Sequence, residues 1–286
     1  MALETIVAKI NTAKYTWVRD EPTEDDLSYI LKQGLQTPSA FDPLKLREQV
    51  FNDLRAGKAK LVCKVGLSPP AKVLAVVYPD TKIPWELFGR IFSAFGRSSK
   101  QWRVIWFAHP QKREFPSKEP EANALNASLH TGQRQTESIQ PLHLNGGYAY
   151  ACQPETVVIY REEEAARVLV HELLHAACTD DMKNPEEVRE VLTESWAELF
   201  LIAVLAKGSL TKAKKLWRMQ AQWIIDQETV LKGYGVLTPQ NYAWRYTVGR
   251  REVLERMGLR FPAPSADPMF VLGGSLRFTT PSLSFD

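Results

Sequence analysis

The chain has 286 residues, of which 44% are hydrophobic and 24% are charged, and its formal net charge is +3. This composition is close to that of an average soluble domain, which excludes a disordered chain and a fibre. The small net charge, and the absence of a cluster of Lys and Arg interleaved with aromatic residues, also argue against a protein that binds nucleic acid.

The cysteines and apolar stretches indicate a soluble, intracellular protein without a membrane partner. Cys63, Cys152 and Cys178 lie far apart and lack CxxC spacing, so we expect reduced thiols and no disulfide framework. The first residues include Glu4 and contain no long apolar run, which argues against a secretory signal. The longest apolar stretch, LFLIAVLA, is far shorter than the roughly 20 residues that cross a bilayer.

The first part of the chain, 1–160, is expected to mix strands and helices. Its patterns predict strands at 60–66, 72–78 and 102–108 and a helix at 83–96. The segment 109–138 is polar, contains prolines and has no period, so it is expected to be a functional or disordered loop, with a flap as one interpretation. Two further strands are predicted at 142–151 and 156–160, and Gly146 and Gly147 indicate a bulge or the close approach of another backbone.

The second part, 161–260, is expected to be helical. The patterns predict helices at 162–178, 184–208, 211–231 and 238–257, and the second of these has Pro185 at its first position and Gly208 at its end. The third part, 261–286, contains Pro, Ser, Gly and Thr and is expected to be an extended tail. The fold class is therefore α+β, with a mixed sheet first and helices after it.

The sequence HELLH places His171 and His175 four residues apart, with Glu172 after the first histidine. Histidines at this spacing share one face of a helix, so both imidazoles can bind one cation. Glu172 projects beside them and can take a proton from a metal-bound water, which makes it the candidate general base. The alternative interpretation is a pair of core histidines on an amphipathic helix.

A catalytic zinc needs a third protein ligand and an open position for water. Glu194 follows His175 by 19 residues, on a helix that must run antiparallel to the first, and it is the predicted third ligand. Glu198 lies four residues further, in apolar surroundings, and is the predicted hydrogen-bond partner of a zinc-bound histidine. The alternative for both glutamates is a solvated acidic face that continues Glu187 and Glu190.

Two other metal sites are possible from the sequence. Asp181 follows His175 by six residues, a spacing at which some zincins use an aspartate as third ligand, although Cys178 stands where that turn normally needs glycine. A di-iron bundle needs a second ExxH motif, which the chain lacks.

HELLH followed by ESWAE resembles the zincin metallopeptidases of the gluzincin type, whose pattern is HExxH plus a downstream glutamate that opens an ExxxD or ExxxE pair. The wider run from Leu142 to Phe200 is similar to predicted metallopeptidases of large DNA viruses and some eukaryotes, with a weaker similarity in YTVGRREVL. The resemblance implies a zincin fold, a zinc ion bound by His171, His175 and Glu194, and an association with a virus or its host cell. It does not extend to the first 140 residues.

The resemblance also implies how a peptide or protein substrate binds and is hydrolysed. The strand before the active helix would be an edge that pairs with an extended peptide, and NGGYAY, with Asn145, Gly146 and Gly147, would supply it. Tyr246 is the first candidate for stabilising the oxyanion and Arg250 the second. The alternative function is a non-enzymatic structural or interaction protein on a zincin scaffold, with LRFTTPSLSFD as a docking segment.

Overall fold

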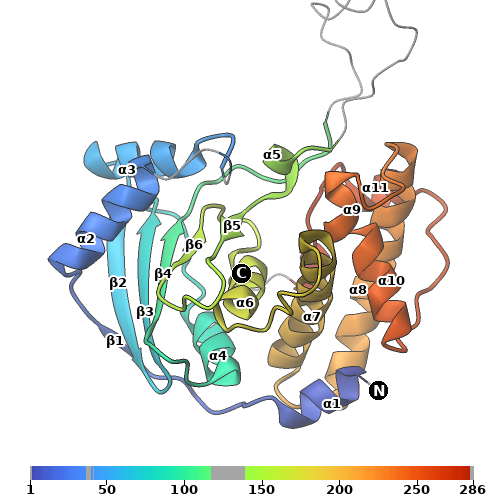
Figure 1. The fold of residues 1–286 in the computed structure, drawn as a ribbon, viewed down its shortest axis with the longest axis horizontal. Helices are drawn as coiled ribbons and strands as arrows, with labels where there is room; N and C mark the ends of the chain where they lie inside the picture. Colours follow the sequence, from blue (N-terminus) through green and yellow to red (C-terminus); the bar gives the residue numbers. More distant parts are fainter. Residues whose placement is uncertain (1, 37–39, 41, 117–138, 284–286) are drawn as a thin grey trace, which may run out of the picture.

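The structure is a computed structural model of the chain, and it describes residues 2–36, 40, 42–116 and 139–283 (Figure 1). Its strands are β1 (Trp17–Arg19), β2 (Lys60–Leu67), β3 (Pro70–Val77), β4 (Trp102–Phe107), β5 (Gly147–Tyr148) and β6 (Val157–Ile159). The helices of the first part are α1 (Ala2–Lys9), α2 (Glu24–Leu31), η1 (Lys32–Gln36), α3 (Leu46–Arg55), α4 (Trp85–Phe95) and α5 (Pro141–Leu144). Those of the second part are α6 (Ala165–Ala176), α7 (Glu186–Ala206), α8 (Leu210–Gly233), α9 (Tyr242–Tyr246), α10 (Val248–Arg256), α11 (Pro268–Leu272) and η4 (Pro281–Leu283). The chain is an α+β protein.

The six strands form one mixed sheet in the order β1-β2-β3-β4-β6-β5. β3, β4 and β6 run parallel, whereas β1, β2 and β5 pair antiparallel with their neighbours. Helices cover both faces, α2 and α3 on one side and α4 and α6 on the other (Figure 1). β5 therefore forms one edge of the sheet, and it packs against α6.

The alternation of side chains along the central strands explains the two layers of helices. In β3, Val73 and Ala75 face the core shared with α4 and α6, and Leu74 and Val76 face the core under α2 and α3. Because both faces are covered, β3 is apolar at nearly every position, as strands buried on both sides usually are. The strands predicted around 60–66, 72–78, 102–108 and 156–160, and the helix around 83–96, are confirmed.

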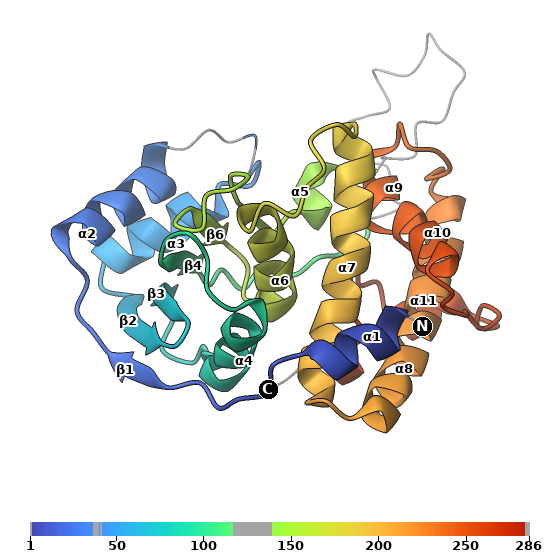
Figure 2. The same ribbon diagram turned by 60° about the horizontal axis from the view of Figure 1, so that its bottom comes forward.

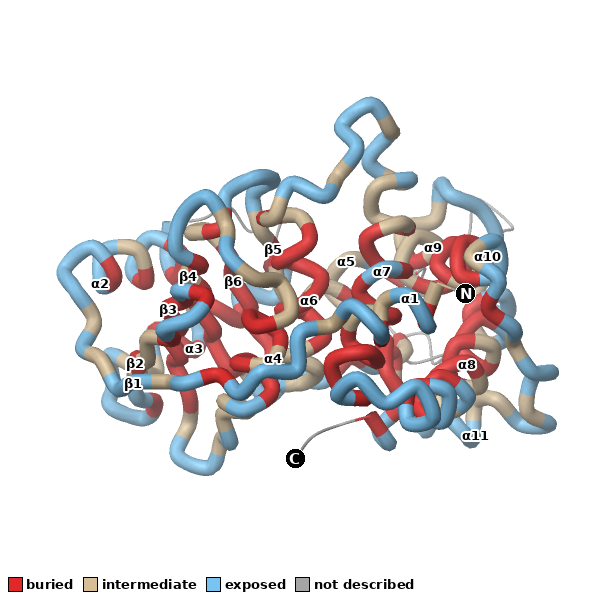
Figure 3. The backbone as a smooth tube through the Cα atoms, turned by 90° about the horizontal axis from the view of Figure 1, so that it is seen from below, coloured by how far each residue is buried: buried red, intermediate tan, exposed pale blue. Residues whose placement is uncertain are grey.

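One apolar core joins the sheet to the helical part. It continues from β3 and β4 through α6 and α7 into α8, and Figure 3 shows the same continuous buried backbone. Helix α1, from the very start of the chain, packs on α7 and α8 rather than on the sheet (Figure 2). The apolar core therefore continues across the boundary expected at residue 160.

Two predicted segments differ from the structure, and a third lies mostly outside the described residues. The strand predicted at 142–151 is wrong, because Pro141 begins the short helix α5 and only Gly147 and Tyr148 pair with β6. The helix predicted at 238–257 is divided into α9 and α10 at Thr247, whose φ and ψ of −132° and −83° are not helical. Most of the flap interpretation falls on residues 117–138, which lie outside the described residues.

Residues 276–283 of the predicted tail pack against the rest of the protein. Leu276 and Phe278 are buried, and the Glu164 carboxylate accepts hydrogen bonds from the backbone N–H groups of Phe278 and Thr279 at 3.0 and 2.7 Å. Glu164 precedes α6, so this segment closes over the beginning of the helix that carries HELLH. As far as Leu283 the proposed docking segment is packed against the protein.

Among the described residues, no helix has the length and apolar character needed to span a membrane.

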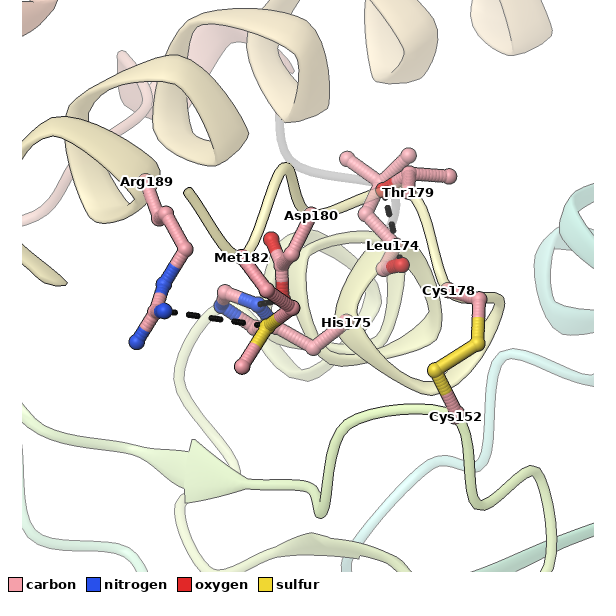
Figure 4. The surroundings of a disulfide bond; sticks show 8 residues. All are labelled: Cys152, Leu174, His175, Cys178, Thr179, Asp180, Met182 and Arg189. Atoms are coloured by element: carbon pink, nitrogen blue, oxygen red, sulfur yellow. Dashed lines mark hydrogen bonds and ion pairs between the residues drawn. A yellow bond between two sulfur atoms is a disulfide. The ribbon is translucent and has the colours of Figure 1, made fainter. Parts of the chain in front are cut away.

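Cys152 and Cys178 form a disulfide, so the expectation of reduced thiols is wrong for these two (Figure 4). Cys63 is free and buried. The disulfide links the connection between β5 and β6 to the end of α6, and the backbone N–H groups of both cysteines donate to the His175 carbonyl at 3.1 Å. Two segments that the sequence separates by 26 residues are thereby held together beside the second histidine.

Replacing Cys178 by serine is expected to reduce the free energy of unfolding. The bond closes a loop of 26 residues, and the loss of that constraint on the unfolded chain is worth about 3 kcal/mol. Urea unfolding measures the change, with wild type in dithiothreitol as a second sample. Thiol titration of the unfolded protein should find one thiol before reduction and three after it; three before reduction would contradict the disulfide.

Replacing Gly147 by alanine is expected to destabilise the edge strand by about 1–3 kcal/mol, the usual range for overpacking. A Cβ at this position would lie 2.5 Å from Val168 Cγ1 and 2.8 Å from the Val158 carbonyl oxygen, which is backbone and cannot move alone. Gly233→Ala is the matched control, because nothing lies within 4 Å of its Cβ. Equal thermal stability of the two variants would show that β5 and α6 are not packed this closely.

Candidate metal centre

Helix α6 brings His171, Glu172 and His175 together in a mostly buried position. One side of the helix packs on β5 and β6 and the other on α7, so the helix is apolar around most of its surface. The two imidazole rings lie one turn apart with centroids 4.7 Å from each other. Their Nε2 atoms face each other at 3.0 Å, which brings both rings to one point, as predicted.

Glu190 of α7 completes this cluster. Its carboxylate oxygens lie 3.5 Å from His171 Nε2 and 3.5 Å from His175 Nε2. One ligand atom from each of the three residues lies within 4.8 Å of the others, and these are the residues that form a candidate metal group in the described part of the chain. From the sequence, Glu190 was assigned to a solvated acidic face. Its position four residues before Glu194 could have indicated that both side chains face the histidines.

Glu194 lies on the other side of the His171 ring. Its Oε1 is 2.9 Å from His171 Nδ1, and its second oxygen forms a buried ion pair with Arg167. Burial raises the pKa of Glu194, but Arg167 and His171 outweigh this effect and hold the pKa well below its usual range. Glu194 as third ligand does not fit this geometry: the structure offers Glu190 instead, one helical turn earlier, and Glu194 takes the place of histidine partner.

Glu198 does not contact either histidine. Its Oε2 accepts hydrogen bonds from Arg250 Nη1 at 2.9 Å and from Gln220 Nε2 at 3.2 Å, in a fully buried position. The predicted role of Glu198 as partner of a metal-bound histidine is therefore wrong, because α7 carries it one further turn away. Arg250 is held in the same pair, so it does not fit the role of oxyanion donor.

His175 has its own carboxylate partner, which the sequence analysis missed. Asp180 Oδ2 lies 2.8 Å from His175 Nδ1 (Figure 4). Asp180 Oδ1 accepts a hydrogen bond from Thr193 Oγ1 at 3.2 Å. Asp181 is exposed and accepts a hydrogen bond from the Lys183 backbone at 3.1 Å, so it does not reach the cluster. Asp180, the preceding residue, is the carboxylate that the turn directs toward His175.

The two histidines differ in their Nδ1 contacts. The Asp180 oxygen 2.8 Å from His175 Nδ1 favours a proton on that nitrogen, since two lone pairs would otherwise repel each other. Glu194 Oε1 lies 2.9 Å from His171 Nδ1, but not in the direction of an N–H hydrogen bond, so this contact is one of charge. The 3.0 Å contact between the two Nε2 atoms is a hydrogen bond only when one of them carries a proton, and both atoms lie 3.5 Å from Glu190. Burial lowers the pKa of His171, but Glu194 and Glu190 outweigh it and raise the pKa well above 6.5. The centre thus favours positive charge where the three donors meet.

Glu172 lies in the same cavity, which has a volume of about 380 Å³. Burial raises the pKa of its carboxyl group to about 7, although both histidines lower it. One of its oxygens would lie 3.2 Å from a Cβ at Gly147, so the carboxylate sits beside the edge strand. A carboxyl group with this pKa can both accept and donate a proton near neutral pH.

The remaining predicted site residues also line this cavity. Asn145, Gly146 and Gly147 form its wall on the side of the sheet, and Tyr246 lies on the side of the helices. The hydroxyl of Tyr242, which the sequence analysis did not select, donates to Asn145 Oδ1 at 2.6 Å and lies 3.2 Å from the Tyr246 hydroxyl. Burial raises the pKa of Tyr246 well above 10, so its hydroxyl stays protonated.

Comparison of the chain with models of protein families, with curated proteins and with solved structures found no significant match. The function is therefore inferred from the residues of the cavity and from the sequence pattern that predicted them.

Proposed function

We propose that the protein is a zinc-dependent metallopeptidase with a zincin-like fold. The observation that carries this proposal is the convergence of His171 Nε2, His175 Nε2 and the Glu190 carboxylate in one cavity with Glu172. Two histidines and one glutamate are a common ligand set of catalytic zinc, and they leave a fourth position open. A structural zinc site needs neither an open position nor a base.

The residues around the donors fit a divalent cation. Both histidines present Nε2 to the cluster; Asp180 forms a hydrogen bond at His175 Nδ1, and the Glu194 carboxylate lies 2.9 Å from His171 Nδ1. Such partners fix the ring orientation and increase the basicity of the ligand nitrogen. Bound zinc would lower the pKa of a coordinated water to about 7 and polarise the scissile carbonyl.

Glu172 is the proposed general base. Its carboxylate lies between the histidine cluster and the edge strand, where it takes a proton from the attacking water and passes it to the leaving amine. The Tyr246 hydroxyl, protonated and on the opposite wall, is the proposed donor to the oxyanion of the tetrahedral intermediate. Both groups act on the same peptide bond.

The edge strand is the proposed site of the substrate backbone. Among the described residues β5 pairs with β6 alone, and we propose that its other side takes an extended peptide that adds a strand to the sheet. Asn145 and the two glycines keep this wall free of bulky side chains. The proposed substrate is therefore an extended stretch of polypeptide that lies along the cavity.

Zinc content distinguishes the possible third ligands. We expect about one zinc per chain in wild type, a large loss of affinity in Glu190→Gln, and a loss of roughly 10-fold to 100-fold in Glu194→Gln, as for other carboxylate partners of ligating histidines. Elemental analysis and competition with a chromophoric chelator measure both quantities. Glu187→Gln on the same helix is the control, because Glu187 pairs with Arg245.

If Glu190→Gln retains zinc and Glu194→Gln loses it, Glu194 and not Glu190 is the third ligand. A wild-type protein that neither carries nor takes up zinc would overturn the metal centre itself, and would favour the non-enzymatic alternative.

Glu172→Gln is expected to keep its zinc and to lose peptide hydrolysis by at least about 100-fold, because the amide cannot accept the proton. A denatured, fluorescently labelled protein serves as substrate for the zinc-loaded wild type and variant. Equal hydrolysis by both would exclude Glu172 as the base. The absence of hydrolysis by a zinc-loaded wild type would contradict the proposed activity while leaving the metal site intact.

A further inference from the structure

Arg189 stands between two cavities. It lies in the first turns of α7, next to Glu190, and lines the cavity of the metal centre. It also lines a second, mostly apolar cavity of about 610 Å³ whose other walls include Ile6 of α1, Leu174 of α6 and Trp196 of α7. Asp180 and Arg189 border both cavities, so a group bound by Arg189 would lie within reach of each.

The acidic residues near Arg189 have other partners, and the adjacent Glu190 contacts His171 and His175. Glu186 pairs with Arg245 Nη1 at 2.9 Å and Glu187 with Arg245 Nη2 at 3.1 Å. Asp180 is occupied by His175 and Thr193. Within the part of the chain that the structure describes, no carboxylate oxygen lies within 4.0 Å of the Arg189 guanidinium.

The hydrogen bond that Arg189 does form is weak. Its Nη1 donates to Met182 Sδ at 3.6 Å, and a thioether is a poor acceptor (Figure 4). Arg113 and Arg167 also line the metal cavity, but each is buried and paired with a carboxylate, Glu164 or Glu194. Arg189 is half-buried and lines both cavities, so the N–H groups that do not contact Met182 are accessible to a ligand.

We propose that Arg189 binds a carboxylate of the substrate and makes the cleft selective for acidic peptides. This inference rests on the proposed peptidase function. A guanidinium with free N–H groups binds a carboxylate through two parallel hydrogen bonds, which fixes orientation as well as charge. The carboxylate belongs either to an aspartate or glutamate side chain or to the C-terminus of the peptide; the chemistry at Arg189 is the same.

The test measures binding in the zinc-loaded Glu172→Gln protein, where hydrolysis does not interfere. The probes are capped, dye-labelled heptapeptides of alanine and phenylalanine in which one aspartate moves through every position, beside the same peptides with asparagine. A second set compares a free C-terminal carboxylate with its amide. Fluorescence anisotropy gives the affinities.

Arg189→Gln is expected to lower the affinity for the preferred acidic peptide roughly tenfold or more, as the loss of a hydrogen bond to a charged group does, and to leave neutral peptides unchanged. Arg189→Lys should retain part of the preference, because it keeps the charge but not the paired donors. Arg218→Gln, an exposed position on α8, is the control for the change of net charge.

A preference for aspartate over asparagine that Arg189→Gln removes identifies an acidic side chain as the ligand. A preference for the free C-terminus over the amide that Arg189→Gln removes identifies the C-terminal carboxylate. No preference for either carboxylate, or a preference that Arg189→Gln retains, overturns the inference. If wild-type protein fails to hydrolyse peptides but binds acidic ones through Arg189, the peptidase proposal fails and the carboxylate site stands.

Discussion

The ion pair between Arg167 and Glu194 determines the arrangement of the whole site. Both side chains are almost completely buried, and an unpaired charge in such a place costs several kcal/mol. Because Arg167 belongs to α6 and Glu194 to α7, the pair fixes how far one helix is shifted along the other. That shift places Glu194 at His171 Nδ1 and Glu190, one turn away, beside both Nε2 atoms.

The same row of buried charges continues one turn further along α7. Glu198 lies 3.9 Å from Arg167 Nε and pairs with Arg250, which also donates to the Phe278 carbonyl at 3.3 Å. The ring of Phe278 stacks on Tyr246 with centroids 6.0 Å apart and lines the metal cavity. The last described segment of the chain is therefore part of the wall of the site, held there by buried charge.

The sequence was sufficient where a pattern is local. HELLH on a helix, the glycines beside it and the central strands all follow from side-chain periodicity, and the structure has them. The third donor was missed because Glu190, Glu194 and Glu198 are spaced four residues apart on one helix face, and periodicity alone cannot choose among them. The choice depends on the axial shift between α6 and α7. The ion pair between Arg167 and Glu194, which are far apart in sequence, determines that shift. The disulfide, Asp180 and the packed chain end were missed for the same reason.

The charges around the three donors explain why Glu190, and not Glu194, matches a cation. The charge of Glu194 is offset by Arg167, whereas among the described residues Glu190 has its ionic contacts with the two histidines. Burial lowers the pKa of His171, but the carboxylates of Glu194 and Glu190 hold it well above 6.5, so a proton on that ring offsets the charge of Glu190. A divalent cation there would take the place of that proton and bind both Nε2 atoms and the Glu190 carboxylate together. It would keep a residual positive charge, which is the condition for polarising a carbonyl.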